Sequence, residues 1–426
     1  MSTLTIASPP AASSSATKSS FVEVWLVTIG HALTHWYPAT FYLLLPLIGA
    51  ELGLSYLQIG SILTVQATAG ALSNIPGGML VDSVGRKGLL MAISLFWVGA
   101  PYLLMSFSHQ YAMLLGCAAL VGMGNNLWHP TAIPLLAKRF PERRGLVVSI
   151  HGMGGNVGDA VAPLVVGWML YAISWRNVMM LNVLPGVLMS GIILLSLGRM
   201  QSQASGTGYG GAEKPQAPAS LAKRLSDFRQ LLSNRTLVTL SVSGAFRSMT
   251  QSTLLTFLPI FLLREMDFSK LGVGNALFAM QVAGFAAAPI AGHLSDKVGR
   301  RRIIMSSMAT SGVILLSMAF AGRSPAFVFL VAFLGFFLFA IRSVMQAWLL
   351  DMTPPNMGGT SIGVLFGTQA IGVALGPFIG GLIADHFGLI STFYFLALTI
   401  VAANMFILFT PAPVEQPRWA PSAAAE

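Results

Sequence analysis

The chain has 426 residues and a formal net charge of +10, and it is 54% hydrophobic with only 9% charged residues. An ordinary soluble domain carries roughly 25% charged residues, so this composition excludes a soluble globular protein and predicts a chain embedded in lipid. The positive charge requires no nucleic acid partner, because it gathers in loops that are predicted to face the cytoplasm.

Residues 1–20 are rich in Ser, Ala, Thr and Pro and lack the basic start and apolar core of a signal peptide, so we predict a disordered tail. The chain then divides into twelve apolar stretches, each near the ~20 residues that cross a bilayer. They lie at about 22–49, 56–81, 88–108, 110–137, 145–172, 177–198, 236–262, 271–295, 303–322, 325–350, 358–385 and 390–410. A polar cytoplasmic linker at 199–234 separates two groups of six, and a second tail follows at 412–426. The sequence predicts an all-α membrane protein of twelve transmembrane helices, in two six-helix halves at 21–198 and 235–411.

The basic residues set the predicted orientation. With the amino terminus inside, 18 of the 24 Lys and Arg residues face the cytoplasm, as the positive-inside rule requires. We predict an integral protein of the plasma membrane, the inner membrane in a bacterium, with both termini cytoplasmic. Its basic loops contact membrane lipids, and residues 221–232 have an amphipathic basic pattern suited to the membrane surface. We expect a monomer that does not bind nucleic acid.

A ten-residue motif occurs at equivalent places in the two halves. GMLVDSVGRK at 78–87 returns as GHLSDKVGRR at 292–301, an offset of 214 residues. In each copy a glycine can take a positive φ in a short turn, and an aspartate can accept backbone or arginine hydrogen bonds. Parallel repeats that enclose a site are typical of membrane transporters. We expect conformational gating by Gly78, Asp82, Gly85, Arg86, Gly292, Asp296, Gly299 and Arg300.

A second repeat with the same offset lies in the fifth and eleventh stretches. The pattern G-x-x-x-A-P-x-x-V-G at 158–167 corresponds to G-x-x-x-G-P-x-x-G-G at 372–381. Small residues four apart let helices approach closely, and a proline bends its helix. We therefore expect Pro163 and Pro377 to act in gating, with a purely structural role in packing as the alternative.

The ten-residue motif resembles the signature loop G-x-L-x-D-x-x-G-R-[RK] of the major facilitator superfamily. In that superfamily the loop joins helices two and three and helices eight and nine, and the resemblance extends over nearly the whole chain. The pattern at 372–381 is similar to an element associated there with exporters that work by antiport. The resemblance implies a transporter working by alternating access, in which helices one, four, seven and ten line a central cavity.

Within the superfamily, three stretches resemble exporters of the fosmidomycin-resistance type. They are GMGNNLWHP at 122–130, R-G-x-x-x-S at 144–149 and G-G-N-x-G at 154–158. The sequence differs from that type at Thr131 and His35, where an acid is usual. It also has Ala118 where antiporters of drugs and protons commonly have arginine.

Ionisable residues inside the predicted helices are few, and such residues usually face a cavity or a partner because charge in hydrocarbon is costly. His31 and His35 lie four apart on one face of the first helix, His129 lies on the fourth, and His151 and Asp159 lie on the fifth. Histidine titrates near pH 6.5 when unperturbed, which suits proton transfer. We predict that proton coupling involves Asp159, His35, His31 or His129, with hydrogen bonding between helices as the alternative.

Two arginines lie near mid-membrane on the seventh and tenth helices, each with a glutamine one turn away. A guanidinium donates two parallel hydrogen bonds to a carboxylate or phosphonate, so these residues favour an anionic ligand. An aromatic wall is expected from Trp36. The predicted substrate-binding residues are His35, Arg247, Gln251, Arg342, Gln346 and Trp36.

These observations predict a proton-coupled exporter, an antiporter, of a small organic compound or drug, with an anion favoured. Proton-coupled uptake of a small carboxylate or phosphorylated metabolite is one alternative, and a membrane sensor without transport is another. We do not expect an enzyme, because no loop can hold a domain and no nucleophile lies beside a base. No G-x-x-x-x-G-K-[ST] loop for ATP is present, so coupling is expected from an ion gradient. The single Cys117 excludes multi-cysteine metal sites, and we expect no metal and no cofactor.

Overall fold

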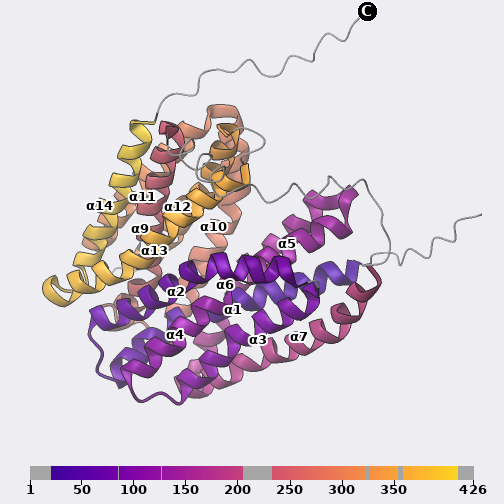
Figure 1. Cartoon of the computed structure of the whole chain (residues 1–426). Coiled ribbons are helices and arrows are strands. Elements are labelled where there is room, and N and C mark those ends of the chain that lie inside the picture. The colour runs from indigo at the N-terminus through magenta and orange to yellow at the C-terminus, as the bar shows by residue number, and fades with distance from the viewer. Residues whose placement is uncertain are drawn as a thin grey trace, which may run out of the picture.

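The computed structural model describes residues 21–84, 86–125, 127–204, 233–321, 326–353 and 358–410, which are helical almost throughout. The first half consists of α1 (Phe21–Glu51), α2 (Tyr56–Ser83), α3 (Lys87–Ser106), α4 (Tyr111–Asn125), α5 (Trp128–Arg139), a 3-10 turn (Pro141–Arg143), α6 (Arg144–Ala172) and α7 (Trp175–Ala204). The second half consists of α9 (Arg235–Arg264), α10 (Lys270–Val298), α11 (Arg300–Ala321), α12 (Ala326–Asp351), α13 (Gly358–Phe387) and α14 (Ser391–Leu408). Figure 1 shows them as two helical bundles, the first in indigo to magenta and the second in orange to yellow.

The described helices give an all-α membrane protein. Seven of them contain a stretch long and apolar enough to cross a membrane, on α3, α7, α10, α11, α12, α13 and α14. Each half has six spans when α4 and α5 are counted together. The predicted tails at 1–20 and 412–426 and the amphipathic pattern at 221–232 lie outside the described residues. Of the predicted linker at 199–234, residues 199–204 continue α7 as a helix.

The predicted fourth span at 110–137 is two helices, not one. α4 ends at Asn125 and α5 begins at Trp128. Pro130 favours a break here, because proline has no N–H to donate to a continuous helix and its ring crowds the preceding turn of such a helix. Trp128 is fully buried and packs against Gly30 of α1, which anchors the start of α5.

The sequence repeat reappears in the helix packing. Within the halves, α1 packs on α6 as α9 packs on α13, α2 on α4 as α10 on α12, and α3 on α7 as α11 on α14. Between the halves, α2 packs on α13 and α10 packs on α6. The helix starts repeat as well, since Ser55 caps α2 and Ser269, 214 residues later, caps α10. The contacts thus follow the same offset as the sequence.

The two halves touch through helix backbones at equivalent glycines. Gly60 of α2 lies against the carbonyl oxygen of Pro377, and Gly274 of α10 lies against that of Pro163. A Cβ at either glycine would collide with the oxygen, so a larger residue would force the helices apart. The prolines that we expected to act in gating therefore lie at the contact between the halves, and their role stays a prediction.

This contact lies toward one end of the molecule, which we call the gate end. The gate end carries residues 52–55, 107–110, 173–174, 265–269 and 388–390. The opposite end, which we call the motif end, carries residues 84, 86, 140–143 and 299.

Hydrogen bonds between the halves, among the described residues, all lie on the gate side. Asp385 of α13 accepts hydrogen bonds from the backbone N–H groups of Tyr56 and Leu57, both at 2.8 Å. These are free donors at the first turn of α2, where the helix dipole favours a carboxylate. Thr64 donates to the carbonyl of Ala374 at 2.6 Å. The structure is therefore closed at the gate end.

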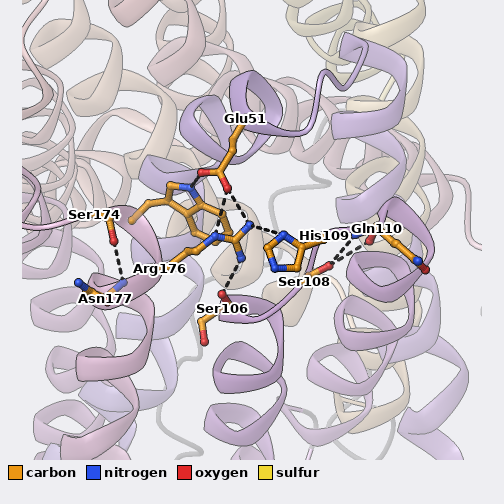
Figure 2. Close-up of polar contacts among 9 residues, drawn as sticks. Glu51, Ser106, Ser108, His109, Gln110, Ser174, Arg176 and Asn177 are labelled. Atoms are coloured by element: carbon orange, nitrogen blue, oxygen red, sulfur yellow. Dashed lines mark hydrogen bonds and ion pairs between the residues drawn. The ribbon is translucent and has the colours of Figure 1, made fainter.

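Within the first half, Glu51 joins three helix ends at the gate end (Figure 2). Its carboxylate accepts hydrogen bonds from Trp175 Nε1 at 2.5 Å and from Arg176 Nη2 at 2.7 Å. Arg176 also donates to the carbonyl of Ser106 at 2.6 Å and stacks on the ring of Trp175. The hydrogen bonds from Trp175 and Arg176 hold the pKa of Glu51 below its ordinary value.

We expect Gly274→Val to separate the halves at the gate end, because the added side chain meets the carbonyl of Pro163. Overpacking of this kind typically costs about 1–3 kcal/mol. The measurement is the electron–electron distance between spin labels at positions 109 and 386, in a Cys117→Ala background, which should lengthen. Gly191→Val is the matched control, because a Cβ there meets nothing within 4 Å. An unchanged distance in Gly274→Val would contradict the role of the glycine.

We expect Glu51→Gln to lower the thermal unfolding midpoint at neutral pH. Because the native pKa is lowered, the carboxylate stabilises the fold above the ordinary value of 4.5, and this contribution is lost as pH falls through the native pKa. The midpoints of wild type and variant should therefore converge in acid. Glu142→Gln, an exposed site without a described hydrogen bond, is the control. A difference that stays constant from pH 7 to pH 3 would show that the ionised carboxylate is not the cause.

Candidate substrate cavity

A cavity lies between the halves, on the motif side of the gate-end contacts. It consists of two hollows of about 400 Å³ and about 390 Å³ that share Tyr42, Gln251, Leu255 and Arg342 in their walls. Each volume falls within the range of roughly 300–1,000 Å³ that holds small organic ligands. The lining residues come from both halves, so movement of the halves would alter the cavity.

His35 and Asp159, predicted separately as mid-membrane candidates, form a hydrogen-bonded pair in the second hollow, which is an ion pair when the His35 ring is protonated. His35 Nδ1 lies 2.9 Å from Asp159 Oδ2, and their side chains are 30% and 31% exposed. The pair joins α1 to α6. These helices approach closely because Gly158 has no side chain, and a Cβ there would collide with the carbonyl oxygen of Ala32. An acid and a base in contact with the cavity can each take or release a proton. The pair is therefore placed where a proton and a ligand can meet.

Three further histidines, His31, His129 and His151, gather beside this pair, and the sequence did not predict the four histidines as a group. The ring of His31 lies 4.8 Å from those of His35 and His129 and 4.1 Å from that of His151. His31 Nδ1 donates to the backbone carbonyl of His151 at 2.6 Å. His31, His35 and His129 line the second hollow, and His151 is buried behind them.

The two arginines differ in their surroundings. Arg247 is buried and donates to Gln251 at 2.8 Å and to Ser248 at 3.1 Å, so its guanidinium is largely engaged within α9. Arg342 is exposed in the cavity, lines both hollows, and has no hydrogen bond or ion pair with the described residues. Gln346 lines the second hollow one turn away. Arg342 is thus the arginine placed to meet a ligand.

Trp36, which we expected to form a cavity wall, contacts α7 in this structure, and its role in substrate binding stays a prediction. Its indole N–H donates to Asn182 of α7 at 2.5 Å, and Trp36 contributes to neither hollow. One residue around a helix turns the side chain by about 100°, so the residue after His35 faces a different neighbour. Among aromatic residues of α1, Tyr42 lines both hollows instead, seven positions after His35 on the same face.

Sequence reasoning also missed the uncharged polar lining. Gln66, Asn74 and Gln369 contribute to the first hollow and Gln281 to the second. The Oε1 of Gln66 and the Nε2 of Gln369 are buried without a partner among the described residues. Gln and Asn side chains inside apolar helices are a sequence signal for a polar cavity, and a search limited to charged residues overlooked them.

The repeated ten-residue motif lies at the motif end, away from the cavity. In the second copy, Arg300 forms an ion pair with Asp296 at 3.2 Å and another with Asp351 at the end of α12. Gly299 ends α10 with a φ of 102°, as expected for the turn. Neither Gly78 nor Gly292 lies close to another helix.

In the first copy, Arg86 is exposed at the start of α3. Gly85 and the side chain of Asp82 lie outside the described residues. The gating role of both copies stays a prediction.

Comparison with known proteins identifies the relatives of this fold. A family model described as Major Facilitator Superfamily matches residues 24–269 and 240–425. The fosmidomycin resistance protein of Escherichia coli is 26% identical over 94% of this chain and 95% of its own. A probable sulfoacetate transporter of Cupriavidus necator is 26% identical over 80% of this chain and 82% of its own.

A solved structure gives the same fold. It is a bacterial homologue of the human lysosomal transporter Spinster in an inward-facing and occupied conformation. It superposes with a TM-score of 0.77 over 95% of this chain and 100% of its own, at 17% identity. The two proteins therefore share the arrangement of helices across the whole chain.

Proposed function

This chain belongs to the Major Facilitator Superfamily, and from that membership and the cavity we propose that it is a proton-coupled transporter that exports a small organic anion by antiport. We place it in a bacterial inner membrane as a monomer, with both termini and the motif end in the cytoplasm, following its basic loops. The closed gate end then faces outward, and a ligand reaches the cavity from the cytoplasm.

The single observation that carries the proposal is the His35–Asp159 ion pair in the wall of a ligand-sized hollow. A proton that binds the pair removes the attraction between its two members. Because α1 and α6 provide the pair, and α6 also contacts α10 of the other half, its protonation acts on a helix at the contact between the halves. This is the physical route that we propose for coupling a proton to alternating access.

The charges of the cavity favour an anion. Among the described lining residues, the groups charged at every physiological pH are Arg247 and Arg342, and Asp159 is the one carboxylate. Asp159 is engaged with His35, which leaves Arg342 available for a ligand. The relative named a sulfoacetate transporter supports this preference, since sulfoacetate is an anion.

Proton-coupled uptake is the second candidate, and one observation favours it. The carboxylate of Asp159 and the guanidinium of Arg342 both line the second hollow. A proton on Asp159 would remove a competitor for Arg342, so proton and anion would favour each other's binding and move together. The name of the fosmidomycin resistance protein supports export instead.

Flux in proteoliposomes with an imposed pH gradient tests the function and its direction. A panel of small carboxylates, sulfonates and phosphonates is compared with neutral and cationic compounds of similar shape. Movement of an anion against the direction of the proton gradient supports antiport, and movement with it supports uptake. Preference for cations would contradict the anion site, and absence of flux for every compound would favour a sensor.

We expect Asp159→Asn to abolish accumulation driven by a pH gradient while substrate exchange at equal pH continues. The amide keeps the shape of the carboxylate but cannot carry the charge that pairs with His35. His35→Ala should give the same loss. His386→Ala, an exposed histidine at the gate end, is the control. Wild-type pH dependence in both cavity variants would place the proton site elsewhere.

We expect Arg342→Gln to weaken anion binding about ten- to hundredfold, the range for a lost hydrogen bond to a charged group. Arg342→Lys should restore part of it, because ammonium lacks the planar fork. Arg247→Gln should chiefly lower the thermal midpoint, since the Arg247 guanidinium is buried and bonded within α9. Binding constants and midpoints of the three variants check this division. Unchanged anion affinity in Arg342→Gln would exclude Arg342 from the site.

A further inference from the structure

The histidine cluster contains nitrogen atoms that nothing in the described structure satisfies. His31 Nε2 and both ring nitrogens of His151 are buried without a hydrogen-bond partner. The two residues are only 4% and 2% exposed. Buried polar side-chain atoms in folded proteins normally have partners, so three unsatisfied ring nitrogens at one place need an explanation.

Three of the histidines can place ligand atoms around one point. One nitrogen from each of His31, His129 and His151 lies within 4.8 Å of the other two. Nitrogens that bind one zinc ion at about 2.0–2.1 Å with tetrahedral angles are roughly 3.3 Å apart. His129 is exposed, so a rotation of its side chain can supply the remaining approach.

Hydrogen bonds at one nitrogen of a ring leave the other nitrogen available to bind a metal ion. His31 donates its Nδ1–H to the carbonyl of His151, so in the neutral ring its Nε2 carries the lone pair. Histidines that bind metal usually donate the other ring nitrogen in this way to a carbonyl or a carboxylate. His35, whose ring lies 4.8 Å from that of His31, likewise uses its Nδ1 in a hydrogen bond to the carboxylate of Asp159.

Space for the rings depends on Gly155 of α6. A Cβ there would lie 2.8 Å from Cε1 of His31 and 3.0 Å from Nε2 of His35. The absence of a side chain at this position lets two rings of α1 lie against α6 beside His151. The close packing of the histidine rings therefore depends on the absence of a side chain at Gly155.

We propose that His31, His129 and His151 bind a divalent transition-metal ion such as Zn²⁺ in the wall of the cavity. Imidazole nitrogens suit zinc, copper, nickel and iron, whereas magnesium and calcium prefer oxygen ligands. Three protein ligands leave a fourth position open, and His31 and His129 line the second hollow. His35 lies beside this position, and a water or an anionic ligand in the hollow can also occupy it.

A proton alone explains the cluster less well. The rings of His31 and His151 are stacked at 4.1 Å and 17°, and positive charge on both at this distance would be strongly repulsive. A single ion binds one nitrogen of each of the three rings while the rings stay neutral, and of the three unsatisfied nitrogens it accounts for His31 Nε2 and one of His151. The carboxylate of Asp159 in the same hollow offsets part of the added charge. This site departs from the expectation of no metal, and it does not depend on the direction of transport.

Direct binding tests the proposal on the full-length protein, with any affinity tag removed and bound metal stripped by a chelator. Equilibrium dialysis with radioactive Zn²⁺ should give one ion per chain. His129→Ala and His151→Gln should each weaken binding by more than about tenfold, at least the loss seen when residues around metal ligands are changed. His293→Ala and His386→Ala, both exposed and outside the cluster, should bind as the wild type does. Absence of binding, or binding that the cluster variants leave unchanged, overturns the site.

A second measurement needs no variant and so does not depend on whether the variants fold. Electron spin-echo spectroscopy of the wild type with one equivalent of Cu²⁺ counts the imidazoles coordinated to the ion. Three or more coordinated imidazoles support the proposal, and fewer than three overturn it.

Discussion

The contact between the two halves depends on helix backbones that approach without side chains between them. Two equivalent contacts close the gate end. Gly60 packs against Pro377, and Gly274 packs against Pro163. In lipid, apolar side chains gain little by leaving one hydrocarbon environment for another, so close packing and hydrogen bonds must hold helices together. The carboxylate of Asp385 on the first turn of α2 adds such hydrogen bonds at the same end. Among the described residues, these contacts hold the halves together at the gate end, and the cavity lies on the motif side of them.

Several polar side chains within the membrane are hydrogen-bonded to one another. These bonds determine which charged side chains are available to bind a ligand. His35 is bonded to Asp159, and Arg247 to Gln251 and Ser248. A lone charge in hydrocarbon is costly, so these bonds make the wall of the cavity possible. Among the charged residues that line the cavity, Arg342 is the exception, since it faces the cavity without a described hydrogen-bond partner. Its charge is therefore available to a ligand, which is why the proposed specificity rests on this residue.

The histidine cluster and the pair of His35 and Asp159 lie in one wall of the cavity, which α1, α5 and α6 of the first half provide. The second half contributes Arg342, Gln346 and Gln251 from α12 and α9. The residues proposed for proton or metal binding and Arg342, proposed for anion recognition, thus come from different halves, which a rocking motion would bring together or separate. This division gives a physical basis for linking ligand binding to movement, because each half alone presents an incomplete site.

The sequence by itself determined the compartment, the helices and their duplication. Apolar runs of membrane length and motifs repeated at an offset of 214 residues can be read without a structure. The all-α fold followed from the runs, and the family followed from the resemblance of the ten-residue motif to the signature loop of the superfamily. Only the tertiary structure decided which ionisable residues meet. His35 and Asp159 are 124 residues apart, and their contact depends on Gly158 bringing α6 against α1. Packing likewise decided that Trp36 contacts Asn182 and lines neither hollow. It also decided that Arg247 is hydrogen-bonded within α9 while Arg342 is exposed in the cavity. A helix pattern gives the face of a residue relative to its own helix, whereas the neighbour of that face is a property of the assembled bundle.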